Sequence, residues 1–111
     1  MTVRELADIL SATTLNEADF TRQVDGGYAG DLLSFVMGRA PENSAWYTVM
    51  TNVNVAAVAV LADVSVVVLC EGCMPDVALA DRAKSQLVNL IVTDLDMYTA
   101  IAEVARHDCS V

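Results

Sequence analysis

The stretch Thr21–Asp31, which reads TRQVDGGYAGD, holds three of the five glycines of this 111-residue chain. Glycine permits positive φ angles and close backbone approach, so the stretch is predicted to be a shaped loop. A short β-type run, residues 20–24, leads into it, and a helical pattern, 32–40, leads out, with Asp31 placed to cap that helix. The sequence therefore predicts a strand, a glycine loop and a helix N-terminus in succession.

The alternation of strand and helix continues to the end of the chain. Strands are expected at 45–50, 64–69 and 87–92, and helices at 55–62, after Asp76 and at 94–106. The last helix is expected to turn five side chains inward: Leu95, Tyr98, Ile101, Ala102 and Ala105. Upstream, Thr2 and Glu5 have the spacing of a capping box for a helix at 3–11, and a short strand at 13–15 follows.

Repeated strand–helix units produce crossover connections and therefore a mainly parallel sheet. The run VSVVVL at 64–69 is typical of a central strand that is buried on both faces. We predict an α/β fold in which a mainly parallel sheet carries helices on both faces, giving three layers. The whole chain, 1–111, is expected to form one compact domain, with a frayed tail at 107–111.

Composition and charge narrow the possible partners. The chain is 55% hydrophobic but only 5% aromatic, which is more apolar surface than one small domain can bury alone. We therefore expect a homodimer. A net charge of −9 with six scattered Lys and Arg residues argues against nucleic acid and against anionic membrane surfaces as partners.

Neither a secretory signal nor a membrane span is predicted. The N-terminal residues contain early acids and no apolar core. The apolar run 53–70 is interrupted by Asn54, Asp63 and Ser65, which suits a helix, a turn and a strand better than a span. Three cysteines without a signal suggest reduced thiols and a cytoplasmic location.

Several separated motifs resemble the stand-alone members of the DRTGG domain family. They are the stretch from Arg22 to Ser34, then AWYTV at 45–49, TNVNVAAVAV at 51–60, Glu71-Gly72 and Pro75-Asp76. Of the motif in the family name, Arg22 and the pair Gly26-Gly27 remain, whereas Thr21 stands in place of the acid and Asp25 precedes the glycines. Related domains occur in CBS-containing inorganic pyrophosphatases and in the N-terminal part of HPr kinase-like proteins. The resemblance implies a regulatory or dimer-forming domain.

Ligands of open α/β sheets gather beyond the carboxyl ends of the strands. We therefore expect a small anionic or nucleotide ligand near the glycine loop, held by residues that converge at this edge. The candidates are Arg22, Gly26, Gly27, Tyr28, Asp31, Thr51, Asn52, Glu71 and Gly72. The alternative interpretation of the same residues is a tight turn and ordinary helix caps.

No catalytic constellation emerges from the sequence. Cys70 and Cys73 have the C-x-x-C spacing of redox or metal sites, but Glu71 between them would raise the pKa of a thiol. A zinc site would need His107 and Cys109 as further ligands, at a poor spacing, so we predict no metal and no cofactor. The chain also lacks the G-x-x-x-x-G-K-[ST] loop that holds ATP phosphates. The sequence favours a non-catalytic, ligand-sensing regulatory domain, with a protein–protein interaction module of a redox or metabolic enzyme system as the alternative.

Overall fold

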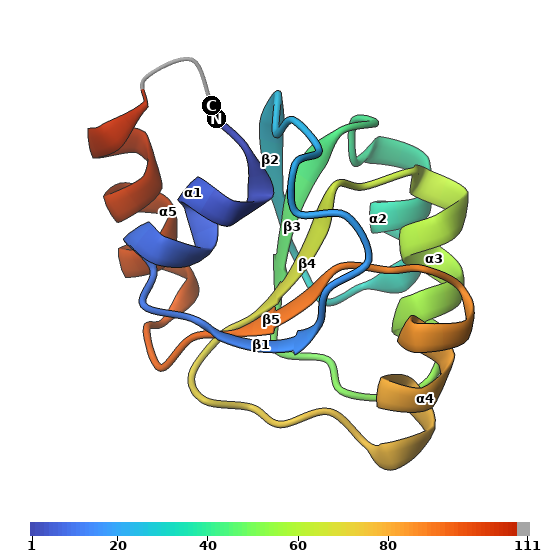
Figure 1. The fold of residues 1–111 in the computed structure, drawn as a ribbon. Helices are drawn as coiled ribbons and strands as arrows, with labels where there is room; N and C mark the ends of the chain where they lie inside the picture. The colour runs from blue at the N-terminus through green and yellow to red at the C-terminus, as the bar shows by residue number, and fades with distance from the viewer. Residues whose placement is uncertain (109–111) are drawn as a thin grey trace.

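A computed structural model describes residues 1–108 of the chain. Within them lies one five-stranded sheet with the strand order β1-β5-β4-β3-β2, in which only β1 runs antiparallel to its neighbour. The mainly parallel α/β fold is thus confirmed (Figure 1). Its elements are α1 (Val3–Ile9), β1 (Thr13–Asn16), β2 (Gly26–Ala29), α2 (Leu33–Arg39), β3 (Ser44–Thr48), α3 (Asn54–Ala62), β4 (Val66–Leu69), α4 (Val77–Ser85), β5 (Leu90–Val92) and α5 (Met97–His107).

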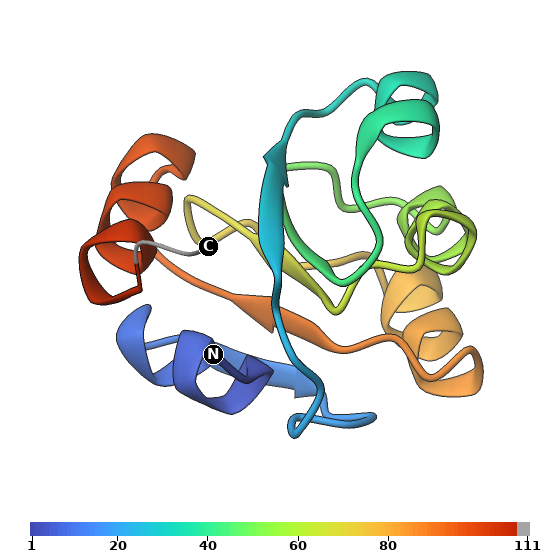
Figure 2. The same cartoon turned by 90° about the horizontal axis from the view of Figure 1, so that it is seen from above.

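The helices cover the two faces of the sheet unequally. On one face, α2, α3 and α4 pack around a core that includes Trp46 and Leu69; on the other, α1 and α5 pack around Tyr47 and Ile91. Figure 2 shows the resulting three layers from above. Because α2, α3 and α4 are the connections between successive parallel strands, all three crossovers lie on the same face of the sheet.

Local signals explain most of these elements. The capping box is confirmed, since the Thr2 hydroxyl accepts from the Glu5 N–H and the Glu5 carboxylate accepts from the Thr2 N–H at 3.0 Å. The β-branched run forms β4, and every residue from Val64 to Cys70 is buried, as expected for a central strand. Asp63 ends α3 in the left-handed conformation, with a φ of 56°.

The prediction that the glycines form a loop is wrong. Gly26 and Gly27 lie inside β2, which pairs in parallel with β3 in a regular register from Gly26–Ser44 to Ala29–Tyr47. Among the described residues, the only glycine with a positive φ is Gly72. The predicted strand at 20–24 is instead an irregular segment, and its Phe20 and Val24 side chains are buried in the core formed with α1 and α5.

Two helix assignments also need correction. Asp31 does not cap α2, whose N-cap is Leu32 without a side-chain hydrogen bond. The final helix begins at Met97 and is capped by Asp96, so its faces are rotated from those expected: Ala100 and Val104 are buried, whereas Tyr98 is 83% exposed. Of the predicted frayed tail, residue 107 is the last of α5, and residues 109–111 lie outside the described residues.

Within residues 1–108, no helix has both the length and the apolar character needed to cross a membrane.

Candidate ligand pocket beside strand β2

Arg22 lies at the opposite end of the sheet from the predicted ligand residues Thr51, Asn52 and Glu71. Its guanidinium donates to the Asn43 side chain at 2.9 Å and to the Asp63 carbonyl at 2.8 Å, and it pairs with the Asp63 carboxylate at 2.9 Å. Asn43 directly precedes β3, and Asp63 lies shortly before β4, so Arg22 joins the amino ends of two strands. Thr51, Asn52 and Glu71 follow the carboxyl ends of these strands, and the predicted convergence with Arg22 does not occur.

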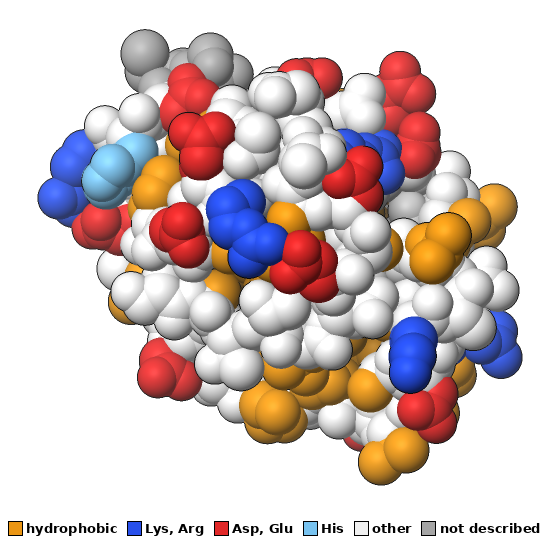
Figure 3. Space-filling model, viewed as in Figure 1, with side chains coloured by type: hydrophobic (Ala, Val, Ile, Leu, Met, Phe, Trp, Pro, Cys, Tyr) orange, Lys and Arg blue, Asp and Glu red, His pale blue; other side chains and the backbone are white. Residues whose placement is uncertain are grey.

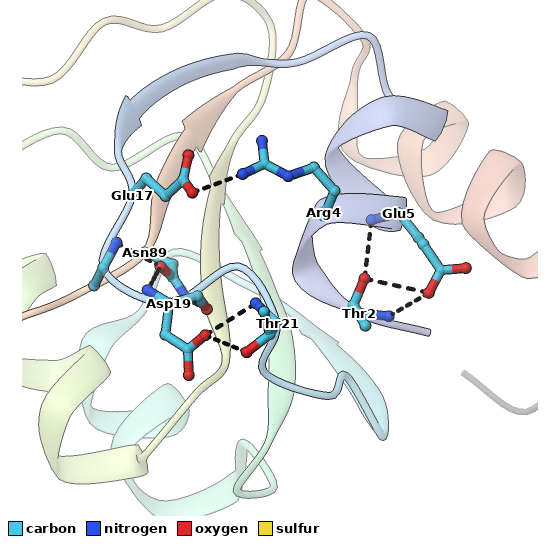
Figure 4. Close-up of polar contacts among 8 residues, drawn as sticks. Thr2, Arg4, Glu5, Glu17, Asp19, Thr21 and Asn89 are labelled. Atoms are coloured by element: carbon cyan, nitrogen blue, oxygen red, sulfur yellow. Dashed lines mark hydrogen bonds and ion pairs between the residues drawn. The ribbon is translucent and has the colours of Figure 1, made fainter.

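Asn89 organises the amino end and was missed by sequence reasoning. Its side-chain oxygen accepts from the N–H groups of Ala18 and Asp19, and its amide donates to the carbonyls of Asp19 and Ser65 at 2.7 and 2.9 Å. Figure 4 shows this buried amide beside Asp19, whose carboxylate in turn accepts from Thr21. The available signal was one asparagine in the otherwise apolar run 87–92.

At the carboxyl end, Asp31 links β2 to the loop after β3. Its Oδ1 accepts from the Thr48 hydroxyl at 2.7 Å and from the Val49 N–H at 2.9 Å. Nearby, Asn52 accepts from the Asn54 N–H at 2.9 Å. These contacts give Asp31 and Asn52 local structural roles at this edge of the sheet.

Glu71 and Gly72 form a turn at the end of β4 that is fixed by the chain after β5. Their φ angles are 58° and 65°, and the Cys73 N–H donates to the Cys70 carbonyl across the turn. The Glu71 N–H donates to the Leu95 carbonyl at 2.8 Å, and the Gly72 N–H donates to the Thr93 carbonyl at 2.9 Å. These hydrogen bonds hold the turn in place, and the N–H groups of Glu71 and Gly72 are therefore not available to a ligand.

The electrostatics of the carboxyl end oppose an anion. Asp31, Glu71, Asp94 and Asp96 all follow strand ends there. The basic residues in α2, α4 and α5 lie in the last turns, which point the other way because each helix returns antiparallel to the strand before it. Ligand crevices of doubly wound sheets open where successive crossovers change face, and here the crossovers stay on one face.

A pocket instead opens beside the glycine stretch. Its volume is about 190 Å³, and it lies between the edge strand β2 and helix α5, which Figure 2 shows to one side of β2. Gly27 and Ala29 have no bulky side chain to cover this part of the sheet, so the ring of Tyr47 is reached across β2. The lining is mostly apolar and consists of Gly27, Tyr28, Ala29, Tyr47, Ile101 and Val104.

Burial raises the pKa of two groups near this end of the sheet, Cys70 and Tyr47. Burial, with a smaller contribution from nearby Glu71, raises the pKa of the Cys70 thiol to about 12. Burial likewise raises the pKa of the Tyr47 phenol. Cys70 is thus a protonated core residue at neutral pH, whereas Cys73 is partly exposed. This environment therefore does not activate Cys70 as a thiolate.

Residues 1–108 contain no cluster of three or more His, Cys, Asp or Glu side chains that could hold a metal ion. Cys109, a ligand of the zinc alternative, lies outside the described residues.

Neither a protein-family model nor a curated protein matches the chain. Among solved structures, it is similar to the CBS and DRTGG domains of the regulatory region of Clostridium perfringens pyrophosphatase, a structure complexed with the activator diadenosine tetraphosphate. The TM-score is 0.76 at 18% sequence identity, over 93% of this chain and 45% of that chain, so this chain spans less than half of that regulatory region. At this identity the likeness shows a common fold, and it supports the DRTGG-like domain that the sequence motifs predict.

Proposed function

We propose that this chain is a non-catalytic, cytoplasmic regulatory domain that senses a nucleotide through the pocket beside β2. The observation that carries the proposal is the pocket of about 190 Å³ on the glycine stretch, in a fold shared with the regulatory region of an enzyme that binds a nucleotide activator. The activator is bound by that protein; its relevance to this chain is our proposal.

The chemistry of the pocket suits a base better than a phosphate. The ring of Tyr47 and the aliphatic side chains of Ile101 and Val104 line it, whereas the Tyr28 side chain packs on the opposite face of the sheet. Such a surface holds flat, mostly apolar groups. The pocket is smaller than the roughly 300–1,000 Å³ of sites for drug-sized ligands, so one ring system would enter and the rest would lie outside. We place phosphates toward the amino end of β2, near Arg22, because the carboxyl end is acidic.

Thermal shift and titration calorimetry with adenosine, AMP, ATP and diadenosine tetraphosphate test this function. A ligand that binds the folded state raises the melting temperature by mass action. Adenosine should bind if the base is the group recognised, and the phosphorylated ligands should bind more tightly if Arg22 contacts phosphate. Arg22→Gln should then remove the advantage of the phosphorylated ligands and leave adenosine binding unchanged.

A matched pair of variants locates the site. Gly27→Val places a side chain toward Tyr47, where a Cβ lies 3.4 Å from the ring, and so reduces the pocket. Gly26→Val makes the same chemical change one residue away, where a Cβ meets nothing within 4 Å. Nucleotide binding should fall at least tenfold in Gly27→Val only; equal binding by both variants would place the site elsewhere.

We also propose a homodimer formed through α2 and α3. Leu32, Phe35, Met37, Val60 and Leu61 are exposed on or beside these two adjacent helices, with Leu61 71% exposed. Figure 3 shows hydrophobic side chains on the surface over the α3–α4 side of the molecule. Light scattering should give twice the chain mass, and Leu61→Glu should give the monomer because it would bury a charge in the interface.

The same apolar helices support the alternative function, a protein–protein interaction module without a small-molecule ligand. In that case a partner protein covers α3, the nucleotides produce no thermal shift, and Leu61→Glu prevents a complex with a different protein rather than a dimer. The nucleotide titration and the light-scattering measurement together separate the two functions.

A further inference from the structure

The two edges of the sheet differ in how they are protected against pairing with a further strand. At one edge, β1 pairs with β5 through a register shift between Thr14 and Asn16, and such irregularities blunt an edge against further pairing. At the other edge, β2 pairs with β3 without interruption over four residues. Its residues, Gly26–Ala29, include no lysine, no proline and no charged side chain, which are the usual protections of an exposed strand.

The backbone of β2 offers a defined set of hydrogen-bonding groups to solvent. The Gly30 N–H donates to the Tyr47 carbonyl at 3.1 Å, which fixes the alternation along the strand. Residues two and four positions earlier, Tyr28 and Gly26, therefore also face β3, while the N–H and C=O groups of Gly27 and Ala29 point away from the sheet.

The fold does not explain why β2 contains glycines. Neither Gly26 nor Gly27 has a positive φ, and a Cβ on Gly26 would meet nothing, while a Cβ on Gly27 would make ordinary contacts. Glycine inside a strand costs about 0.5–1 kcal/mol relative to alanine. A glycine that the fold does not require often marks the close approach of another backbone.

We propose that β2 docks an extended segment of a partner protein, which adds a sixth strand to the sheet at its free edge. The segment carries an apolar side chain that enters the pocket lined by Tyr47, Ile101 and Val104, and a basic residue toward each end. Strand addition works in this way elsewhere: backbone hydrogen bonds supply affinity, and pockets for alternate side chains supply specificity.

Charge identifies the partner as basic and argues against a second copy of this chain. Asp25 and Asp31 flank the free edge six residues apart, or roughly 20 Å along an extended chain. Two copies paired antiparallel about Tyr28 would place Asp25 opposite Asp31, a repulsive arrangement, on a chain of net charge −9. Lysines six residues apart in a docked segment would instead lie opposite Asp25 and Asp31. The Oδ1 of Asp31 is held by Thr48 and Val49, so the lysine there would meet its Oδ2.

This inference goes beyond the proposed function but uses the same pocket, so a nucleotide base and the partner's apolar side chain would exclude one another. Binding of the segment is measured without nucleotide, and binding of nucleotide is measured without the segment. The nucleotide proposal and the strand-docking proposal can therefore fail independently of one another. If both bind, adenosine should weaken segment binding competitively.

The probe is the peptide Lys-Thr-Val-Leu-Val-Thr-Lys, capped at both ends, and its control has glutamates in place of the lysines. Fluorescence anisotropy should show binding of the lysine peptide, weakening with added salt, and at least tenfold weaker binding of the glutamate peptide. Absence of binding by the lysine peptide, or equal binding of both peptides, would overturn the proposal.

A second pair of variants tests the backbone contact. Ala29→Pro removes an N–H that points away from the sheet and leaves the ladder to β3 intact, whereas Ala29→Ser keeps that N–H. The proline should weaken peptide binding about tenfold, and the serine less than twofold. Unchanged binding by a folded Ala29→Pro would refute the proposal. If Ala29→Pro unfolds, amide hydrogen exchange of the unmodified protein replaces this test. Bound peptide should slow exchange at the N–H groups of Gly27 and Ala29. Protection that appears only at other residues would refute the proposal.

Discussion

A Cβ added to Gly72 would lie 3.1 Å from Oδ1 of Asp94. The two residues come from the ends of neighbouring parallel strands, β4 and β5, and the backbone between them is joined by the hydrogen bond from the Gly72 N–H to the Thr93 carbonyl. Among the glycines that the structure describes, Gly72 alone has a left-handed backbone, with a φ of 65°. Both the angle and the space therefore select glycine at this position.

Gly72→Ala should lower the free energy of unfolding by about 1–3 kcal/mol, because a side chain is strained at this φ and approaches the Asp94 carboxylate. Gly38→Ala is the matched control, since a Cβ on Gly38 in α2 meets nothing within 4 Å. It should raise stability by up to about 1 kcal/mol through helix propensity. Urea unfolding measures both; equal effects would contradict the role assigned to Gly72.

Asn89→Ala should be the more damaging change at the opposite end of the sheet. It removes four hydrogen bonds and leaves the N–H groups of Ala18 and Asp19, the Asp19 carbonyl and the buried Ser65 carbonyl without this partner. A loss of roughly 2–4 kcal/mol is expected. Asn54→Ala, at an exposed position at the start of α3, should change stability by less than about 0.5 kcal/mol.

Two buried serines at the starts of neighbouring strands should respond in opposite directions. Ser65 donates to the Gln23 carbonyl at 2.5 Å, whereas the Ser44 hydroxyl has no partner among the described residues. Ser65→Ala should cost about 1–2 kcal/mol, and Ser44→Ala should be neutral or stabilise by up to about 1 kcal/mol. Thermal unfolding of the two variants gives the comparison, and a destabilised Ser44→Ala would mean that its hydroxyl has a partner.

The two described cysteines should differ in reactivity. At pH 8 the native protein should be alkylated by iodoacetamide at Cys73 and not at Cys70, because Cys70 is buried and its raised pKa of about 12 keeps the thiol protonated. Mass spectrometry of the digested protein locates the label. Both residues should react once the protein is unfolded in guanidinium chloride. Early labelling of Cys70 in the native state would contradict this assignment.

Cys70 also predicts the direction of an alkaline pH dependence. The folded pKa of about 12 lies above the ordinary thiol value of 9.0, so the folded state holds this proton more tightly than the unfolded state. The stabilisation is fully present below pH 9 and is lost as the pH rises toward 12. Urea unfolding at pH 8 and pH 11 should show the decrease, and Cys70→Ala should show a smaller one.

The mainly parallel sheet and the three layers could be predicted from the sequence because their signals are local and repeated. The β-branched run of β4 and the capping box at Thr2 are each complete within a few residues. The position of β2 could not be read in this way. Gly26 and Gly27 have low strand propensity, and they form a strand because the buried strand β3 presents a regular row of partners beside them.

That one displacement of a strand also accounts for the error in the candidate site. A strand at 20–24 would put the glycines beyond its carboxyl end and Arg22 within reach of them. With β2 at Gly26–Ala29, Arg22 precedes the strand and belongs to the amino end. The pocket itself was outside the reach of sequence patterns, because its wall, Ile101 and Val104, comes from a helix more than seventy residues farther along the chain.

The contact between the two ends of the described chain has a consequence for protein architecture. The Met1 nitrogen lies 3.2 Å from the Asp108 carboxylate, so residues 1–108 begin and finish at one corner of the molecule (Figure 1). A polypeptide that passes through this domain therefore enters and leaves at one place. A host protein could carry the domain within a surface loop with little displacement of the flanking segments, and new termini could be opened elsewhere once a short linker joins the old ones.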